Sequence, residues 1–544
     1  MKKASKFVAS LLAGSMVLSM AACGNDNGNT DQQSSAPQQS SAESTPAAGN
    51  DESTPAESSQ PEQEPAAEVA KPDKIKVMID GTVPTQENYG DDFWKKYTEL
   101  TGIEVEVIQP DHDAYYDVVG QTFAGRDWPD VIILSSTYYT GYASEGALWD
   151  MTDAYANSDL KARHDAKAGS DTVVDSLRIN GDLYGMPATH GNGCVTYVKQ
   201  AWLDNCGITS APTNYEEYVA MLDAFTNGDP DGDGTNGNTF AVAAAGFVGN
   251  EAPYTNYLAE FYQDAYPSFM QDASGNWIDG FETDAMKAAM GRLADAYVNG
   301  YIDPTTLTNG TGDCRNKFYS DEFGVFTYWA GTWANNLKTN LEANGLSGDL
   351  VALPPIAEVG AYVDRITPAW CITSTCENPE GVFKYFIEAM QDGGDVQFLF
   401  TYGVEGKHWS TAAETLWADD PDKAKTYEEG QFHFLPNAEK PTTAYTKAHI
   451  DPMLALVDLE APENSVTEVA KAAQELFNAN CKPAFIVPST DEMSMYNGDL
   501  TTLKNELIAK VTMGEMTIDE AYAKYEADGG AEWSKTIVDS LNAQ

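Results

Sequence analysis

From residue 74 onward, short apolar segments alternate with an amphipathic segment. Residues 74–79 (KIKVMI), 103–109 (IEVEVIQ) and 128–134 (WPDVIIL) are short and rich in β-branched residues, which predicts strands. Residues 91–102 (DDFWKKYTELTG) have the period of an amphipathic helix and end at a glycine. Strands joined through helices favour a parallel sheet covered by helices, so the sequence predicts an α/β fold.

The carboxyl ends of such strands are where ligands bind in open α/β sheets. A loop with acidic residues follows the first strand, another follows the second, and a Ser-Ser-Thr-Tyr-Tyr-Thr run follows the third. Turn or cap residues are the alternative interpretation for each of them, because loops carry sites but mostly carry turns. The candidate ligand-binding residues at this edge are Asp80, Glu87, Asp111, Tyr138 and Tyr139.

The first residues have the pattern of an export signal. Three lysines precede an apolar run, and Met20-Ala21-Ala22-Cys23 resembles the cleavage site of a bacterial lipoprotein, with Met20 where Leu is usual. We therefore expect residues 1–22 to be a signal peptide and Cys23 to carry acyl chains such as palmitate, which anchor the protein at the extracellular face of the cell membrane. An ordinary secretory signal with a chance cysteine is the alternative.

Residues 23–72 are rich in Ser, Gln, Pro, Ala and Glu and have no hydrophobic period. Such a segment cannot bury enough apolar surface to fold, so we predict that it is a disordered tether. The remaining chain of this 544-residue protein is too long for one core, and two or more lobes are expected. No later segment has the roughly 18 consecutive apolar residues that a membrane-spanning helix needs.

The net charge limits the partners. The chain has 83 acidic and 32 basic residues, a formal charge of -51, which repels nucleic acid and anionic lipid headgroups. The sequence has no HExxH, GxSxG or P-loop motif, and no spacing distinguishes one carboxylate pair among so many. We therefore expect a protein that is not an enzyme. The six cysteines after Cys23 are expected to be structural, either bridged or buried.

The order of several motifs resembles that of extracellular solute-binding proteins of ABC importers. The motifs are KIKVMIDG, TGIEVEVIQPDHDAYYDVV, GRDWPDVIIL, DLYGMPATHGNGCVTYVKQAWLDNCGITSAPTNYEEYVAML, FYSDEFGVFTYWAGTWANNL, DRITPAWCITSTCENPEGVFKYFIEAM and a closing helical segment. The resemblance covers nearly all of residues 74–544. YGVEGKHWS further resembles the larger lipoproteins of Gram-positive bacteria, close to the group that includes the alginate-binding proteins.

This resemblance implies a two-lobed periplasmic-binding-protein-like fold of type II, with a ligand cleft between lobes joined by hinge strands. Lobe 1 would comprise residues 73–188 with a return near 370–420, and lobe 2 residues 189–369 with much of 421–544. The chain would cross between the lobes near residues 186–194 and again near 365–372. The lobes would close on the ligand like a hinged jaw.

Aromatic side chains indicate the kind of ligand. Sugars present an apolar C–H face and a rim of hydroxyls, so their sites combine Trp or Tyr with polar side chains. TYWAGTW resembles the family's cleft segment, and further candidates lie in the two crossings and in the YGVEGKHW loop. Core packing is the alternative for each Trp, since large aromatic residues are mostly buried. These candidates are Trp329, Trp333, Trp370, Trp409, His190, Asn192 and Glu405.

The segment 229–238 (DPDGDGTNGN) begins like an EF-hand calcium loop. Oxygens at positions 1, 3, 5 and 7 of such a loop bind the ion, and a glycine makes the turn at position 6. Positions 9 and 12 are Gly237 and Phe240, so the usual acids there are missing. We predict a weakened structural Ca²⁺ site, with an aspartate-rich turn as the alternative. Its expected ligands are Asp229, Asp231, Asp233, Thr235 and Asn238.

The resemblance and the aromatic candidates together predict a lipid-anchored substrate-binding protein of an ABC importer. Its expected ligand is an oligosaccharide, and its expected partners are the permease subunits of the importer. We expect a monomer that contacts the membrane through its lipid anchor only. The alternatives are a binding protein for a peptide or other polar solute, and a surface enzyme that acts on glycans.

Overall fold

The computed structural model of the chain describes residues 69–80, 83–111, 114–125, 127–248, 258–412, 430–436 and 449–543. The predicted signal peptide, Cys23 and nearly all of the predicted tether lie outside these ranges. The described residues belong to one compact unit of the chain. Within the described ranges, no helix is both long enough and apolar enough to cross a membrane.

The first sheet is built around strand β1 (Lys74–Met78). This strand pairs in parallel with β2 (Glu104–Ile108) on one side and with β3 (Val131–Leu134) on the other. All four residues of β3 are buried, which is typical of a strand covered on both faces. Helix α1 (Gly90–Thr101) connects β1 to β2. The three predicted strands and the helix are therefore confirmed, with small shifts at their ends.

Two further strands complete the sheet in the order β2-β1-β3-β14-β6. Strand β14 (Ala369–Ile372) is antiparallel to β3, and β6 (Met186–Pro187) is antiparallel to β14. The three strands that the sequence predicts are therefore parallel to one another, and the sheet gains β14 as an antiparallel strand that the sequence analysis did not predict. Ala369 pairs with both Leu134 and Pro187, so β14 starts and β6 ends at the edge where β3 ends. The chain enters and leaves this sheet at that edge.

A second sheet has the strand order β12-β7-β11-β8. Strand β7 (Cys194–Lys199) pairs antiparallel with β11 (Phe323–Trp329) and with β12 (Leu350–Leu353), and β8 (Phe240–Val242) is parallel to β11. All six residues of β7 are buried. The other strands form two-stranded ladders: β4 (Arg178–Ile179) with β5 (Asp182–Leu183), β9 (Phe269–Gln271) with β10 (Trp277–Asp279), β13 (Tyr362–Asp364) with β17 (Cys481–Pro483), and β15 (Trp409–Ser410) with β16 (His433–Phe434).

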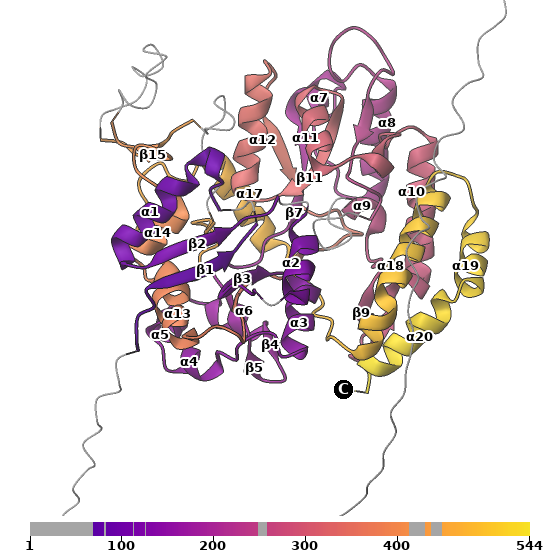
Figure 1. The fold of residues 1–544 in the computed structure, drawn as a ribbon. Coiled ribbons are helices and arrows are strands. Elements are labelled where there is room, and N and C mark those ends of the chain that lie inside the picture. Colours follow the sequence, from indigo (N-terminus) through magenta and orange to yellow (C-terminus); the bar gives the residue numbers. More distant parts are fainter. Residues whose placement is uncertain are drawn as a thin grey trace, which may run out of the picture. The chain divides into compact units, whose positions relative to one another are not determined.

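Each sheet has a hydrophobic core of its own. The first core also receives residues 450 and 455–457, which lie late in the chain. The strands β1 to β3 run side by side in Figure 1. The helices that contribute to the first core are α1, α2 (Tyr115–Ala124), α3 (Ser136–Ser144), α4 (Thr152–Ala156), α5 (Asp159–Ala166), α6 (Ser170–Asp175), α13 (Pro379–Val382), a π-helical segment (Phe383–Glu388) and α14 (Asp395–Tyr402).

The second core is covered by helices from the middle and from the end of the chain. The three C-terminal helices, yellow in Figure 1, pack on one another. Helix α18 packs against α10 as well, which joins the C-terminal helices to the second core. The helices are α7 (Gln200–Asn205), α8 (Tyr215–Asn227), α9 (Ala259–Tyr262), α10 (Asp284–Val298), α11 (Thr311–Tyr319), α12 (Thr332–Ala343), α17 (Glu468–Ala479), α18 (Asp491–Thr512), α19 (Ile518–Ala527) and α20 (Gly530–Leu541).

The segments along which the chain crosses between the two sheets are joined to one another by a hydrogen bond. One crossing runs from β6 to β7 and another from β13 to β14. The backbone N–H of Arg365 donates to the carbonyl of Asn192 at 2.8 Å, which links the two crossings. A Cβ atom on Gly191 would fall 2.0 Å from the carbonyl oxygen of Arg365, so only glycine permits this close approach.

Candidate functional site

A cavity of about 2640 Å³ opens at the carboxyl ends of β1, β2 and β3. It is lined by the loops after these strands, by β11, α11 and α12 of the second sheet, and by the crossing segments. Sites for drug-sized ligands measure about 300–1,000 Å³. The cavity therefore has room for a ligand considerably larger than one sugar ring.

The loops after β1, β2 and β3 form one wall of the cavity, the first wall, and this wall presents carboxylates. Gln109, at the end of β2, fixes the loop after β1 because its side-chain amide donates to the carbonyls of Asp80 at 3.0 Å and Val83 at 2.9 Å. Carboxylates accept hydrogen bonds from hydroxyl groups, so this wall can hold the hydroxyl rim of a polar ligand. The lining carboxylates that the sequence had indicated are Asp80, Glu87 and Asp111.

Two tyrosine rings lie face to face on the same wall. The rings of Tyr116 and Tyr138 are 3.8 Å apart and nearly parallel. Tyr116 shares a hydrogen bond of 2.5 Å with the hydroxyl of Ser135, which fixes its ring. Tyr138 is 42% exposed, whereas Tyr139 is buried and donates its hydroxyl to the carbonyl of Leu177 at 2.6 Å. Of the two predicted tyrosines, Tyr138 therefore offers its ring to a ligand and Tyr139 mainly supports helix α3.

The second wall carries two tryptophans on one short turn. Trp329 ends β11 and Trp333 lies in the first turn of α12. Gly331 between them has φ +69°, and a Cβ there would fall 2.6 Å from the side-chain oxygen of Gln474. Only glycine accommodates this turn, which brings both partly exposed indoles to the cavity. Trp333 also meets the ring of Tyr328 edge to face at 5.0 Å.

An arginine lies over each of these tryptophans. The guanidinium of Arg315, on α11, is 5.1 Å from the ring centre of Trp333, and that of Arg365 is 5.2 Å from the ring centre of Trp329. Arg315 also donates to the hydroxyl of Tyr328 at 3.3 Å. Both arginines line the cavity. Helix α12 adds side-chain amides to this wall, at Asn335, Asn336 and Asn340.

A partly buried aspartate joins the second wall to the late segment of the chain. Asp451 accepts a hydrogen bond from the hydroxyl of Thr332 at 2.8 Å and another from the backbone N–H of Met453 at 2.9 Å. Burial raises the pKa of the Asp451 carboxyl above its usual value. The hydrogen bond to Thr332 holds the start of α12 against the segment that packs into the first core.

Trp370, which the sequence places in the second crossing, belongs to the core and reaches the cavity only at its edge. The side chain is 1% exposed, and its indole N–H donates to Nε2 of His449 at 2.8 Å. Burial lowers the pKa of His449 to about 4, so the imidazole is neutral near pH 7. Because Nε2 accepts, the proton of the neutral ring lies on Nδ1.

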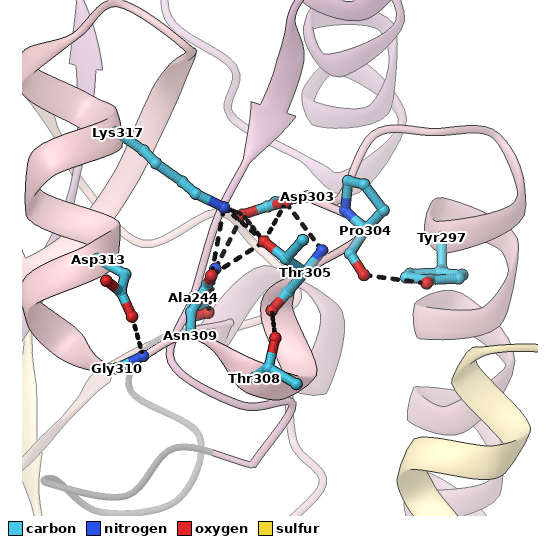
Figure 2. A network of polar contacts seen from close by, with 10 residues as sticks. All are labelled: Ala244, Tyr297, Asp303, Pro304, Thr305, Thr308, Asn309, Gly310, Asp313 and Lys317. Atoms are coloured by element: carbon cyan, nitrogen blue, oxygen red, sulfur yellow. Dashed lines mark hydrogen bonds and ion pairs between the residues drawn. The ribbon is translucent and has the colours of Figure 1, made fainter. Parts of the chain in front are cut away.

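A polar network fixes the start of α11 (Figure 2). The buried carboxylate of Asp303 accepts hydrogen bonds from Lys317 at 2.6 Å and from Asn309 at 2.8 Å. Thr305 contributes a further hydroxyl to the same carboxylate. Burial alone would raise the pKa of Asp303, but these hydrogen bonds together hold it below the usual value. The network thus positions Gly310 and the first turn of α11, both of which border the cavity.

Four candidates from the sequence lie outside the cavity lining. Trp409 donates to the carbonyl of Gly403 at 3.1 Å and stacks on Phe432, and Glu405 is exposed beside it. The side-chain amide of Asn192 donates to the carbonyl of Ala330, in the turn between β11 and α12. His190 is bound through its backbone N–H to Leu454, and burial lowers its pKa. The candidates that the structure brings together on the cavity are Asp80, Glu87, Asp111, Tyr138, Tyr139, Trp329, Trp333 and Trp370.

Several lining residues were missed in the sequence. Arg365 lies in DRITPAW, a motif already associated with the second crossing, so that association was a usable signal. The amides of WANNL lie on α12 directly after the TYWAGTW motif and were equally accessible. His449 and Asp451 reach the cavity from far along the chain, and no local pattern indicates them. The missed lining residues are Tyr116, Arg315, Asn335, Asn336, Asn340, Arg365, His449 and Asp451.

The aspartate loop lies between α8 and β8 and does not line the cavity. Three aspartates, Asp229, Asp231 and Asp233, each contribute one carboxylate oxygen, and these oxygens lie within 4.8 Å of one another. Oδ2 of Asp229 accepts from the backbone N–H of Gly234 at 3.1 Å. Oδ1 of Asp229 is buried, and among the described residues it has no hydrogen-bond partner.

These features fit a divalent cation. A buried carboxylate oxygen without a donor is costly unless a cation or water satisfies it. Desolvation raises the pKa of Asp231 above its usual value, as crowding of carboxylates without an added cation would. The predicted ligand Asn238 presents its amide nitrogen to Asp233 at 3.0 Å, and Thr235 donates its backbone N–H to the same carboxylate. Three carboxylates thus form the core of the donor set.

The six cysteines of the described chain are free thiols. Cys194, Cys314 and Cys371 are buried, which agrees with a structural role. The alternative of bridging is wrong for all six, and the others are only partly buried: Cys206, Cys376 and Cys481. Burial raises the pKa of the Cys314 thiol to about 12, so that thiol is inert near pH 7.

Comparison with known proteins identifies relatives over nearly the whole chain. A family model described as bacterial extracellular solute-binding protein matches residues 83–396. The polygalacturonan/rhamnogalacturonan-binding protein YtcQ of Bacillus subtilis is 21% identical over 491 residues, which span 86% of this chain and 92% of that protein. Lipoprotein LipO of the same organism is 21% identical over 353 residues, 62% of this chain and 68% of LipO.

Solved structures share the fold. The Streptococcus pneumoniae ABC-transporter substrate-binding protein FusA, in complex with kestose, superposes with a TM-score of 0.61 and 16% identity, over 86% of this chain and 99% of FusA. The alginate-binding protein AlgQ2, in a structure without calcium ion, has a TM-score of 0.62 and 18% identity, over 87% of this chain and 98% of AlgQ2. The predicted two-lobed α/β binding-protein fold is thereby confirmed.

Proposed function

The chain belongs to the bacterial extracellular solute-binding proteins, and we propose that within this family it captures an oligosaccharide and delivers it to the permease of an ABC importer. The observation that carries this proposal is the cavity of about 2640 Å³ between two separate cores. Its volume exceeds that of ordinary small-molecule sites more than twofold. A chain of several sugar rings would use this space, whereas a single ring would leave most of it to water.

The lining chemistry supports a sugar ligand. The exposed faces of Tyr138, Trp329 and Trp333 suit the C–H faces of pyranose or furanose rings. The carboxylates of the first wall and the amides of α12 supply acceptors and donors for the hydroxyl rim. Names of the relatives point the same way, since YtcQ is named for polygalacturonan and rhamnogalacturonan and the FusA structure contains kestose.

The crossing segments support closure of the two walls on the ligand. The crossings are joined by the backbone hydrogen bond from Arg365 to Asn192 and by a bond of 3.4 Å between the hydroxyls of Thr189 and Thr367. A few backbone torsions in such segments can absorb a rotation while each core stays intact. We infer that ligand binding favours the closed arrangement, in which both walls contact the sugar and the permease recognises the pair of lobes.

We propose further that the protein is a monomer held at the extracellular face of the membrane by lipid on Cys23, with residues 23–72 as the tether between the anchor and the folded lobes. The sequence pattern at residues 20–23 supports this, as does the name of the relative LipO. Two or more acyl chains give stable attachment without a spanning helix. Residues 73–188 and 189–369 would then form the main parts of the two lobes.

We propose that the aspartate loop holds a structural Ca²⁺. Asp229, Asp231 and Asp233 would bind the ion, and it would supply positive charge that links the carboxylates of the turn between α8 and β8. The orphaned oxygen of Asp229 supports this proposal. A solved structure of FusA, which has this fold, is that of an EF-hand mutant, which also supports the proposal.

Binding can be tested with the purified lipid-free protein, titrated with oligosaccharide ladders while tryptophan fluorescence and heat are recorded. We expect saturable binding at one site per chain, with affinity that rises with the number of sugar residues until the cavity is filled. The recovered sugar should be unchanged in length, because we propose binding without catalysis. Tighter binding of peptides than of any sugar, or release of new reducing ends, would contradict the proposal.

A further inference from the structure

The two cavity arginines differ from the buried cations elsewhere in the chain. Lys199 holds Asp321 at 2.6 Å and Lys504 holds Asp279 at 2.7 Å. Among the described residues, neither Arg315 nor Arg365 forms an ion pair with a carboxylate. This is unexpected in a chain with 83 acidic and 32 basic residues, where a carboxylate is the most available neighbour.

The donors of these two side chains are largely unused. Arg315 donates one hydrogen bond, to the hydroxyl of Tyr328, and no side-chain hydrogen bond of Arg365 is found in the described ranges. A guanidinium has five N–H donors in a planar fork. Stacking over an indole uses none of these N–H donors. It also holds the guanidinium plane in place, so that the N–H groups at its edge can receive an acceptor.

The two arginine–tryptophan pairs occupy one stretch of the second wall. Trp329 and Trp333 are separated only by the Ala-Gly-Thr turn, so Arg365 and Arg315 are held over the two ends of one five-residue segment. The pairs come from different parts of the fold, since Arg315 is on α11 and Arg365 is in a crossing segment. The polar network of Asp303 and Lys317 in Figure 2 fixes the start of the helix that carries Arg315.

The acidic side chains of the cavity are distributed differently from these two arginines. Asp80, Glu87 and Asp111 lie on the first wall, and Asp451 is occupied by Thr332 and Met453. On α11 itself, Asp313 accepts the backbone N–H of Gly310 at 2.9 Å. The cavity therefore has a wall of acceptors for hydroxyl groups and a facing stretch with two guanidinium groups that form no ion pair among the described residues. Burial raises the pKa of the neighbouring Asp364 carboxyl, and the charge of Arg365 offsets only part of this effect.

We propose that the oligosaccharide is acidic, carrying carboxylate groups as a uronic acid does, and that Arg315 and Arg365 bind these carboxylates on successive or nearby sugar residues. This inference rests on the proposed function. The fork of a guanidinium matches a carboxylate in two-point hydrogen bonding, and the low dielectric of a closed cleft strengthens the pair. A neutral sugar would leave the two cations buried and unmatched on closure, which costs binding energy.

The decisive comparison uses one sugar skeleton with and without charge. Oligogalacturonate of four residues and its fully methyl-esterified form differ only in the carboxylates. We expect the acid to bind about 100-fold more tightly than the ester, about 10-fold for each arginine, as charge-assisted hydrogen bonds commonly contribute. The preference should shrink as salt is raised, though less than for an exposed pair. Equal affinity of acid and ester would overturn the inference.

Variants assign the effect to the two side chains. Arg315→Gln and Arg365→Gln should each weaken the acid by about 10-fold and leave the ester within about twofold. Lys535→Gln, which removes a cation from the exposed side of α20, is the matched control and should change neither affinity. If the arginine variants weaken acid and ester equally, the arginines act on packing or on sugar hydroxyls, and the inference is wrong.

A wider panel separates this inference from the function on which it rests. Ladders of galacturonate and mannuronate represent acidic sugars, and ladders of fructose and mannose residues represent neutral ones. Binding of a neutral ladder more tightly than both acidic ladders would overturn the acidic ligand and retain the oligosaccharide. Binding of no ladder, with the protein folded by circular dichroism, would overturn the proposed function and this inference together.

Discussion

The indole N–H of Trp370 and the Nε2 atom of His449, 79 residues apart in the sequence, form a hydrogen bond of 2.8 Å beneath the cavity. Their rings also meet edge to face, with centres 4.6 Å apart. The bond ties β14, the strand that follows the second crossing, to the late segment that returns to the first core. Trp370 therefore connects the strand after the second crossing to the late segment of the first core.

The variant Trp370→Phe should lower stability more than affinity. It keeps an aromatic ring in the core but leaves the partly buried Nε2 of His449 without a donor, which should cost about 1–3 kcal/mol of the free energy of unfolding. Urea denaturation measures this cost. The double variant Trp370→Phe/His449→Phe removes both partners and should recover part of the loss. Full stability with a large loss of affinity would show instead that Trp370 contacts the ligand directly.

Trp333→Ala should have the opposite profile. Trp333 is partly exposed on the cavity and makes its ring available for stacking, so its removal should weaken oligosaccharide binding by about tenfold or more. Titration calorimetry gives the affinity. Trp409→Ala is the control, because Trp409 stacks on Phe432 away from the cavity. The placement of the ligand is wrong if Trp409→Ala weakens binding more than Trp333→Ala does.

Removal of Ca²⁺ should lower the melting temperature more than it lowers ligand affinity. The aspartate loop joins α8 to β8 and is separate from the cavity lining, so the ion would stabilise the second core without contacting ligand. The effect of a chelator on the melting temperature should disappear in Asp231→Asn/Asp233→Asn. Asp272→Asn is the control, since Asp272 accepts the backbone N–H groups of Ser274 and Asn276 in a similar exposed turn without other carboxylates in a cluster.

Lys317→Met tests the network that positions α11. It leaves the carboxylate of Asp303, which is 1% exposed, without its cation, and breaking a buried pair in this way costs about 3–5 kcal/mol. Affinity should fall as well, because Arg315 and the first turn of α11 lose their support. Lys287→Met breaks an exposed pair with Asp284 on the surface of α10 and should cost less than about 1 kcal/mol. Similar losses in both variants would contradict this account.

The fold was predictable to the extent that local pattern determines it. The apolar run at Val131–Leu134 and the helical period after β1 identify the first sheet, because burial on both faces leaves a clear trace in sequence. The direction of β14 was not predictable in this way. It depends on which edge the chain enters after the second crossing, and that is a property of the connection rather than of the strand residues.

The residues of the candidate site were likewise predictable only where a local sequence pattern identifies them. Trp329 and Trp333 could be found because a short motif carries both of them. Whether Trp370 or Trp409 faces a cavity depends on partners such as His449 and Phe432, which come from distant segments. Arg315 has no distinctive neighbours in sequence and becomes notable only because it lies over Trp333 and, among the described residues, forms no ion pair with a carboxylate.

Stability should fall in acid because of buried neutral histidines, and His164 offers the clearest test. His164 is fully buried, with Nε2 at 3.0 Å from the side-chain oxygen of Gln391 and Nδ1 at 3.0 Å from the hydroxyl of Tyr155. Burial lowers its pKa from 6.5 to about 4. The unfolded chain therefore binds a proton at higher pH than the folded chain does.

The direction of the pH dependence follows from this difference. The contribution of neutral His164 is complete above about pH 6.5 and is lost progressively as the pH falls towards about 4, by about 3 kcal/mol in all. His164→Gln removes the titrating group, so it should destabilise the protein at neutral pH, and its free energy of unfolding should fall less steeply with acid than that of the parent. Urea unfolding of both proteins across this range measures the two slopes. Parallel curves would mean that His164 titrates alike in the folded and unfolded chains, and the loss in acid would then have to come from other groups such as His449.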